Sequence, residues 1–193
     1  MQPALALLEL SSIATGIAVG DAMAKRAPID LLYAGTIHPG NFLVLVAGDV
    51  ASVEEAVDAG VLLAIDGLID RILLPDVHDD VVDALRGRRR DGGGEALGII
   101  ETSTASAVVL AADAGVKGAA VTLREIRLAD GLGGKGYLLF SGPVSEVEAA
   151  VDIGAARVEP DHVVGARVIA SLHGEMDANL AASPRFRNRV QGS

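Results

Sequence analysis

The segment TIHPGNF, residues 36–42, places a single histidine, His38, beside a Pro-Gly pair and just before the apolar run FLVLVAG. Proline disfavours a helical conformation in the residue before it, and Pro-Gly is typical of the two central positions of a type II turn. We therefore predict a hairpin whose turn spans His38 to Asn41. Its tip would carry an imidazole, which titrates near neutral pH and binds metals.

A second glycine-rich segment, GLGGKG at residues 131–136, matches the dinucleotide-binding pattern G-x-G-x-x-G. That fingerprint requires a helix after the glycines, whereas the segment YLLFSG that follows has the composition of a strand. We therefore exclude dinucleotide binding. The glycines are expected to let the backbone pack closely. Lys135 is either a solvated lysine or a positive charge that attracts anions.

The remaining titratable residues favour structural roles. His78 and His173 each begin a short predicted helix, which indicates a structural hydrogen bond, and His162 is expected in an exposed loop. Glu9 and Glu101 follow equivalent apolar strands, which indicates a requirement of the fold. The chain has no nucleophile elbow, P-loop, H-E-x-x-H motif or cysteine, so we predict that it is not an enzyme.

These residues are carried by a sequence that repeats itself. Residues 4–31 align with 96–123 at a spacing of 92, and residues 48–60 align with 142–154 at a spacing of 94. The segments around His78 and His173 align at a spacing of 95. The matched positions include charged pairs such as Asp21 with Asp113. Repeats of this kind indicate two copies of one structural unit.

Each copy is predicted to run strand, helix, strand, strand, helix, strand and short helix. In the first copy, ALALLEL is apolar throughout, as in a buried strand. The segment 11–27 follows as a helix with Ser11 or Ser12 as its N-cap, and Pro28 is expected to end it. The second helix repeats apolar residues at helical spacing: Val53, Ala56, Val57 and Gly60, matched by Val147, Ala150, Val151 and Gly154.

We predict a first domain at residues 1–87, an Arg/Gly-rich linker at 88–95, a second domain at 96–182 and a basic tail at 183–193. The linker is expected to be solvated and flexible; a role for Arg88–Arg90 in holding an acidic partner is the alternative. The tail has the same two interpretations.

The composition excludes several classes of protein. The net charge of -10 opposes binding to nucleic acid, and the absence of cysteine excludes thiolate-held clusters. The apolar N-terminus lacks a basic region, and no apolar stretch has the length of a membrane span. A cytoplasmic protein that binds neither nucleic acid nor membrane is expected.

The chain resembles the tandem shell proteins of bacterial microcompartments. The resemblance is carried by ALALLELSSIATGIAVGDAMAKRA, TIHPGNFLVLVAGDV, VEEAVDAG and the strand before His78, and by their second-copy counterparts, over nearly all of residues 4–180. It implies an α/β (α+β) fold with two tandem ferredoxin-like microcompartment domains, forming a trimeric pseudohexamer. Some related propanediol-type proteins have cysteine at the position of His38.

The resemblance further implies a structural shell role. The trimer would be a facet tile in the microcompartment shell, together with other shell proteins (hexamers and pentamers) and encapsulated enzymes. Its pore, which passes metabolites, would be lined by two loops: Thr36, Ile37, His38, Pro39, Gly40 and Asn41, and Gly131, Leu132, Gly133, Gly134, Lys135 and Gly136. Lys25 and Lys117 match the lysine that relatives place at the tile edge. Relatives also carry an arginine where this chain has Asp76 and Ser171. The altered edge contact favours shell layers in which this protein lies beside other shell proteins over layers of this protein alone.

Three interpretations of His38 remain open: a polar pore collar without a ligand, a metal site formed by three His38 imidazoles on the threefold axis, and pH gating by mutual repulsion. The family's cysteine-held iron–sulfur cluster is excluded here. The alternative to a shell protein is a small-molecule or metal-binding sensor or carrier built from tandem ferredoxin-like domains.

Overall fold

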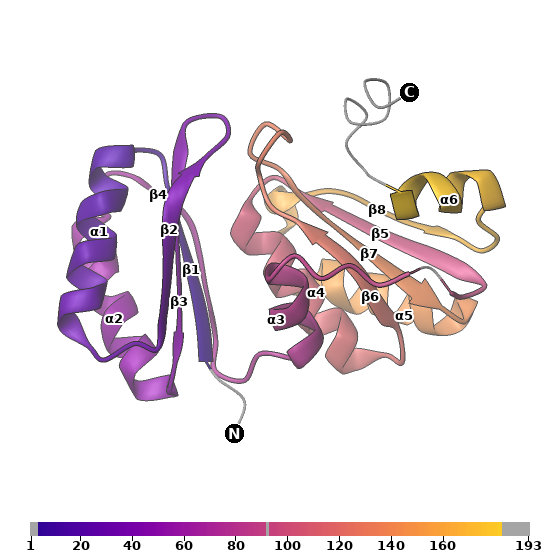
Figure 1. The fold of residues 1–193 in the computed structure, drawn as a ribbon, viewed down its shortest axis with the longest axis horizontal. Helices are drawn as coiled ribbons and strands as arrows, with labels where there is room; N and C mark the ends of the chain where they lie inside the picture. The colour runs from indigo at the N-terminus through magenta and orange to yellow at the C-terminus, as the bar shows by residue number, and fades with distance from the viewer. Residues whose placement is uncertain (1–3, 92, 183–193) are drawn as a thin grey trace.

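The computed structural model describes residues 4–91 and 93–182, and its elements follow one order twice (Figure 1). The first copy comprises β1 (Ala4–Leu10), α1 (Ile13–Arg26), β2 (Leu31–Ile37), β3 (Asn41–Gly48), α2 (Val50–Leu63), β4 (Leu68–Leu74) and α3 (Asp79–Leu85). The second comprises β5 (Ala96–Thr102), α4 (Ala105–Gly118), β6 (Thr122–Arg127), β7 (Gly136–Gly142), α5 (Val144–Arg157), the 3-10 turn η1 (Pro160–His162), β8 (Val163–Ile169) and α6 (Gly174–Ala182). The predicted fold class and element order are confirmed.

Each copy forms one antiparallel sheet, with strand order β2-β3-β1-β4 in the first and β6-β7-β5-β8 in the second. The strand registers also agree, since Glu9 pairs with Leu43 in the first sheet and Glu101 with Tyr137 in the second. Each sheet is covered on one face by the two long helices of its own copy (Figure 1). We call the opposite face the outer face. The shared register defines counterparts for the strand residues, except at Arg124, where β6 has an irregularity in its pairing with β7 that β2 lacks.

The sequence specifies the helix ends locally. Ser12 caps α1 through its side-chain oxygen, which accepts from the backbone nitrogen of Thr15 at 3.3 Å. The helix ends at Arg26, before Pro28, as predicted. The predicted apolar face of α2 is buried. At Gly60, a Cβ atom would lie 2.9 Å from Met23, so only glycine allows α1 and α2 to pack this closely.

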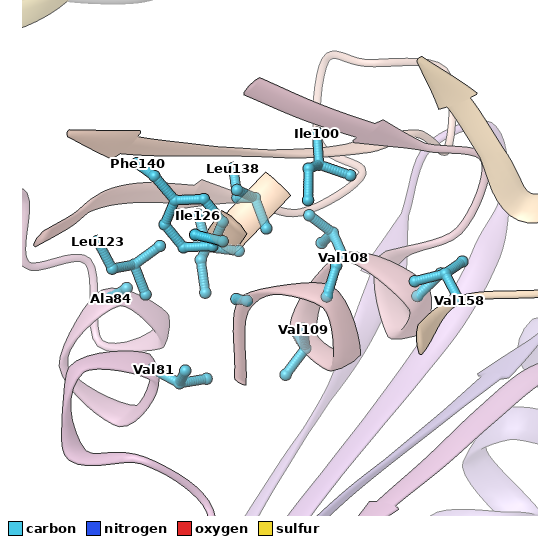
Figure 2. Packing of buried hydrophobic residues seen from close by; sticks show 14 of the residues in the cluster. Val81, Ala84, Ile100, Val108, Val109, Leu123, Ile126, Leu138, Phe140 and Val158 are labelled. Atoms are coloured by element: carbon cyan, nitrogen blue, oxygen red, sulfur yellow. The ribbon is translucent and has the colours of Figure 1, made fainter. Parts of the chain in front are cut away.

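Two hydrophobic clusters fill the molecule. One belongs to the first copy and lies between its sheet and its helices α1 and α2. The other joins both copies, because Leu7 and Ile72 on the outer face of the first sheet pack into the same cluster as α4. Figure 2 shows Val81 and Ala84 of α3 pointing toward Leu123 and Val109 of the second copy. The two copies therefore share part of their core.

The linker is anchored to the protein, so the expected flexible connector is wrong for the arginine run. Arg88 pairs with Asp83 at 3.0 Å, and Arg90 pairs with Asp80 at 2.6 Å. Arg89 pairs with Glu125 at 3.0 Å. The acidic partners that these arginines hold thus include residues of this chain itself. The basic tail, 183–193, lies outside the described residues, and no described helix has the length and apolar character needed to span a membrane.

Candidate functional site: the hairpin tips and the seam between the copies

The tips of the two predicted loops lie side by side. Figure 1 shows the β2–β3 hairpin and the β6–β7 hairpin reaching the same end of the molecule. His38 Nδ1 is 3.4 Å from Asp130 Oδ1, and the backbone nitrogen of Gly131 is 3.4 Å from the same ring nitrogen. A Cβ on Gly134 would lie 3.2 Å from Pro39. The chain therefore brings residues 36–41 and 131–136 together, with His38 largely exposed between them.

The turn at His38 differs from the predicted one. The backbone nitrogen of Gly40 donates to the carbonyl oxygen of Ile37 at 3.0 Å, and the His38–Pro39 peptide is cis. The turn therefore spans Ile37 to Gly40, with proline at its third position, as in type VI turns. The predicted type II turn over His38 to Asn41 is wrong, because isomerism at an X-Pro bond is set by the folded context.

The second loop needs its glycines. Gly131, Gly133 and Gly134 have φ values of 75°, 65° and 93°, in the left-handed region that favours glycine. The loop leads into the strand β7, as expected, so the G-x-G-x-x-G pattern has no following helix. Lys135 is neither isolated nor free, because its Nζ atom lies 2.9 Å from Glu101 Oε1. Sequence reasoning did not foresee this pair or the contact of His38 with Asp130.

Below the tips, Glu9 joins the two copies. Glu9 is 1% exposed, and its Oε2 atom accepts from the backbone nitrogen of Ala105, the first residue of α4, at 2.9 Å. Asn41 Nδ2 donates to the other carboxylate oxygen at 3.3 Å. Burial raises the pKa of Glu9, and the charge of Asp70 adds to this shift, while the bonds from Ala105 and Asn41 oppose it. The sequence indicated that the fold requires Glu9. The structure shows how: Glu9 caps the N-terminus of α4, a helix of the other copy.

A second set of contacts joins the copies at the far end of α4. Asp113 Oδ1 accepts from the backbone nitrogen of His78 at 2.8 Å, and its Oδ2 atom is 2.7 Å from Lys117 Nζ. Lys117 also donates to the carbonyl oxygen of Asp76. Both side chains of α4 thus hold the segment before α3. We call the whole contact between α4 and the outer face of the first sheet, with this segment, the internal seam.

The remaining histidines are structural. His78 Nδ1 accepts from the backbone nitrogen of Asp80 at 3.2 Å, and His173 Nδ1 accepts from that of Glu175 at 3.3 Å, which confirms the predicted hydrogen bonds at the helix starts. His162 is not in an exposed loop. It lies half-buried in η1, 3.8 Å from Asp70 Oδ2 at the internal seam. Within the described residues of one chain, no group of three His, Cys, Asp or Glu is placed to bind a metal.

Comparison with known proteins explains this arrangement. The model of the BMC domain matches twice, at residues 4–77 and 96–172. The chain belongs to the BMC-domain family. The bacterial microcompartment shell protein PduT of Citrobacter freundii is 43% identical over 153 residues, which cover 79% of this chain and 83% of PduT. A crystal structure of a microcompartment protein from Desulfitobacterium hafniense DCB is 38% identical, with a TM-score of 0.81 over 92% of this chain and 99% of that one.

A further solved structure supports the fold alone. The fused permuted hexameric shell protein MSM0275 from the RMM microcompartment is 21% identical, with a TM-score of 0.58, and the match covers 79% of this chain and 80% of that chain. The relatives are thus shell proteins, and two BMC domains in tandem are the architecture of this chain. The resemblance described from the sequence is confirmed, as is the assignment to the microcompartment shell.

The two BMC domains differ in what covers them. On α1, Ile13 and Ile17 are 41% and 58% exposed, whereas their counterparts on α4, Ala105 and Val109, are fully buried in the internal seam. On the outer face of the second sheet, Ile169 is exposed, although its counterpart Leu74 is buried. Within the chain, α4 packs on the outer face of the first sheet. The two equivalent surfaces, on α1 and at Ile169 on the outer face of the second sheet, are both uncovered.

Proposed function

We propose that three copies of this chain close a ring of six BMC domains, which serves as a pore-bearing tile of a microcompartment shell. The observation that carries the proposal is the exposure of Ile13 and Ile17 on α1, together with that of Ile169 on the outer face of the second sheet. The internal seam joins the outer face of the first sheet to helix α4 of the second domain. A head-to-tail contact of this kind, repeated around an axis, produces a closed ring or an open filament.

The polar residues of the internal seam have counterparts placed for the same bonds. Glu101 corresponds to Glu9, and Ile13 corresponds to Ala105. In the ring, Glu101 would accept a hydrogen bond from the partner's Ile13 backbone nitrogen, while it keeps its pair with Lys135. Asp21 and Lys25 pair with each other at 2.6 Å on exposed α1. They would bind the partner's segment before α6, as Asp113 and Lys117 bind the segment before α3.

The ring would gather three copies of both hairpin tips around one axis. Their contact within the chain supports this, because the tips already lie together at one end of the two domains (Figure 1). Lys25 and Lys117 lie in the last turns of α1 and α4, so the part of each side chain that the contact between domains leaves exposed would face the rim, where tiles meet other shell proteins. The pore would pass small metabolites, and enclosed enzymes would be partners of the assembled shell. We propose no catalytic role for the chain.

Native mass spectrometry of the purified protein tests the ring. The expected mass is that of three 19.7 kDa chains, and electron microscopy should show sheets when the protein is mixed with hexameric shell proteins. Ile17→Asp should give a folded monomer, whereas Leu62→Asp, an exposed apolar position on α2, should leave the trimer intact. A wild-type monomer or dimer would contradict the ring and favour the alternative of a sensor or carrier.

A second proposal, that three His38 imidazoles bind a divalent metal on the axis, is supported by the contact of His38 with Asp130. A ligating histidine usually donates its other ring N–H to a carboxylate, which fixes the tautomer. In the Nδ1–H form, His38 would donate to Asp130 and leave Nε2 free for the metal. The competing N–H of Gly131 favours the other tautomer, with Nδ1 as acceptor. Asp130 would act as the positioning residue by favouring the Nδ1–H tautomer over the one that Gly131 favours.

Metal analysis after dialysis against zinc distinguishes a metal site formed by three His38 side chains from a ring of His38 side chains that binds no ligand. One metal ion per trimer is expected, with complete loss in His38→Ala and affinity lowered about 10–100-fold in Asp130→Asn. His173→Ala serves as the control that retains the metal. A wild-type trimer without stoichiometric zinc would show that the collar holds no metal.

A further inference from the structure

On the second BMC domain, the linker fills the space over the outer face of β6 and β7. Arg89 pairs there with Glu125, which is 3% exposed, and donates to the carbonyl oxygens of Leu180 and Ala181 at the end of α6. The backbone nitrogen of Arg90 donates to the carbonyl oxygen of Arg124 at 3.0 Å, which places the linker along the edge strand β6. The linker that follows α3 thus covers the outer face of β6 and β7 in the second domain.

The corresponding space on the first BMC domain is an open groove of about 940 Å³. It runs over the outer face of β2 and β3, and it is closed on its other side by α3 and by one residue of the second domain. Its apolar lining consists mainly of Tyr33, Leu43, Leu45, Val82, Leu85 and Leu128. Tyr33 is 63% exposed in this groove. β2, like β6, is the edge strand of its sheet.

The two grooves select different occupants, as their counterpart residues show. Tyr33 takes the place of Glu125, and Val82 takes the place of Asp177. The second groove thus offers the carboxylate of Glu125 to Arg89, while Asp177 pairs with Arg124, whereas the first groove has Tyr33 and Val82 at these positions and a mainly apolar lining. An occupant of the first groove therefore needs apolar side chains at the positions where the linker supplies arginine.

We propose that the groove of the first BMC domain binds residues 183–190 of the neighbouring protomer, which add to the edge of β2. The sequence SPRFRNRV follows α6 just as the linker follows α3. From Arg185 it alternates basic and non-basic residues, so an extended chain would carry Phe186, Asn188 and Val190 on one face and three arginines on the other. Phe186 and Val190 fit the apolar wall, and the arginines suit the surface of a chain with net charge -10.

The inference rests on the proposed ring, because the ring determines which protomer supplies the segment. Within the chain, α3 of the first domain packs on the second domain and delivers the linker there. In the ring, α6 would pack on the first domain of the next protomer and deliver residues 183–190 to its groove. Met176 on α6, exposed here, corresponds to Val81 on α3, which is fully buried. This exposed residue is consistent with a docking site for α6 on a neighbour.

Disulfide trapping tests the proposal cleanly, because the chain has no cysteine. The double variant Tyr33→Cys/Phe186→Cys, after mild oxidation, should give covalent trimers on a non-reducing gel. The matched control, Ile65→Cys/Phe186→Cys, uses an exposed position after α2 and should give at least fivefold less cross-linked product. Trimers by native mass without cross-links at Tyr33 would overturn the inference and leave the ring standing. Cross-linking only within single chains would overturn it as well.

Hydrogen exchange gives an independent readout without cysteines. In a chain truncated after Ala182, the amides of β2 should exchange at least tenfold faster than in the full chain. Those of β6 should be unchanged, because the linker still covers that strand. Equal exchange of β2 in two trimeric samples would contradict the proposal. A full chain that is not trimeric would instead show that the ring itself, and with it this inference, is wrong.

Discussion

Helices α1 and α4 descend from the same repeated segment and have the same length, yet they lie in opposite surroundings. Val109 of α4 is fully buried against the first domain, whereas Ile17 of α1 is more than half exposed. Asp113 and Lys117 bind the other domain, while the bond that Asp21 and Lys25 make in the described part of the chain joins them to each other. The difference shows that one chain satisfies only one of the two contacts that each domain is built to make.

The comparison explains why an apolar surface persists on α1. Monomeric soluble proteins rarely keep contiguous apolar patches without a use for them, and here the use is specified by the internal seam itself. It also separates residues that hold the chain together from residues that hold the assembly together. The following predictions exploit that separation, beginning with the largest effect.

The matched substitutions Val109→Asp and Ile17→Asp should have different consequences. At Val109 the new carboxylate would be buried without a partner, which costs about 3–5 kcal/mol and should prevent stable folding. At Ile17 the unfolding free energy of the chain should change by less than about 0.5 kcal/mol, while the trimer is lost. Urea unfolding with native mass measures both. Equal destabilisation of the chain by the two variants would refute the division of roles.

Arg89→Ala should destabilise the second domain by about 2 kcal/mol, because it leaves the buried carboxylate of Glu125 without its partner. The estimate is below the full cost of a broken buried pair because Arg89 is partly solvated. Arg88→Ala, which removes an exposed pair with Asp83, should cost less than about 0.5 kcal/mol. Chemical denaturation distinguishes the two variants. Similar losses of unfolding free energy would show that the pairing of Arg89 with Glu125 does not stabilise the second domain specifically.

Asp113→Ala should lower the unfolding free energy by about 1–3 kcal/mol, since the backbone nitrogen of His78 loses its acceptor and the ammonium of Lys117 loses one of its two. Asp21→Ala should leave the chain's stability unchanged within about 0.5 kcal/mol but weaken the trimer. Thermal unfolding at low protein concentration and the concentration dependence of the native mass report the two effects. An Asp21→Ala chain as unstable as Asp113→Ala would break the comparison.

Glu9→Gln should alter how stability depends on pH. Because burial raises the pKa of Glu9 in the folded chain, the folded state binds this proton more tightly than the unfolded state. The wild-type stability relative to Glu9→Gln should therefore fall as the pH rises through and above the ordinary value of 4.5, by about 1.4 kcal/mol for each pKa unit of the shift. Unfolding curves between pH 4 and 7 measure this, and a difference that stays constant over that range would contradict it.

Much of the fold was predictable because the chain repeats its signals. The Ser12 cap, Pro28 after α1 and the apolar face of α2 are local patterns, and the second copy repeats the element order. The position of both hairpin tips followed from the same repeat. These predictions depended on contacts between residues close in sequence or related by the repeat.

What escaped prediction arises from contacts between the copies. The exchange of a type II turn for a cis-proline turn at His38, the pairing of Lys135 with Glu101, and the burial of His162 beside Asp70 all depend on how distant segments meet. The arginines of the linker, expected in solvent, find carboxylates on both domains. No periodicity or motif in the sequence encodes these neighbours.

The separation between the Glu101 carboxylate and the partner's Ile13 backbone nitrogen, measured in an experimental structure of the assembled protein, tests the account most directly. Hydrogen-bond contact is expected, matching the 2.9 Å that joins Glu9 to Ala105 inside the chain. An assembly in which Glu101 faces solvent and contacts α1 of no neighbour would contradict the claim that protomers repeat between them the contact that joins the two domains of one chain.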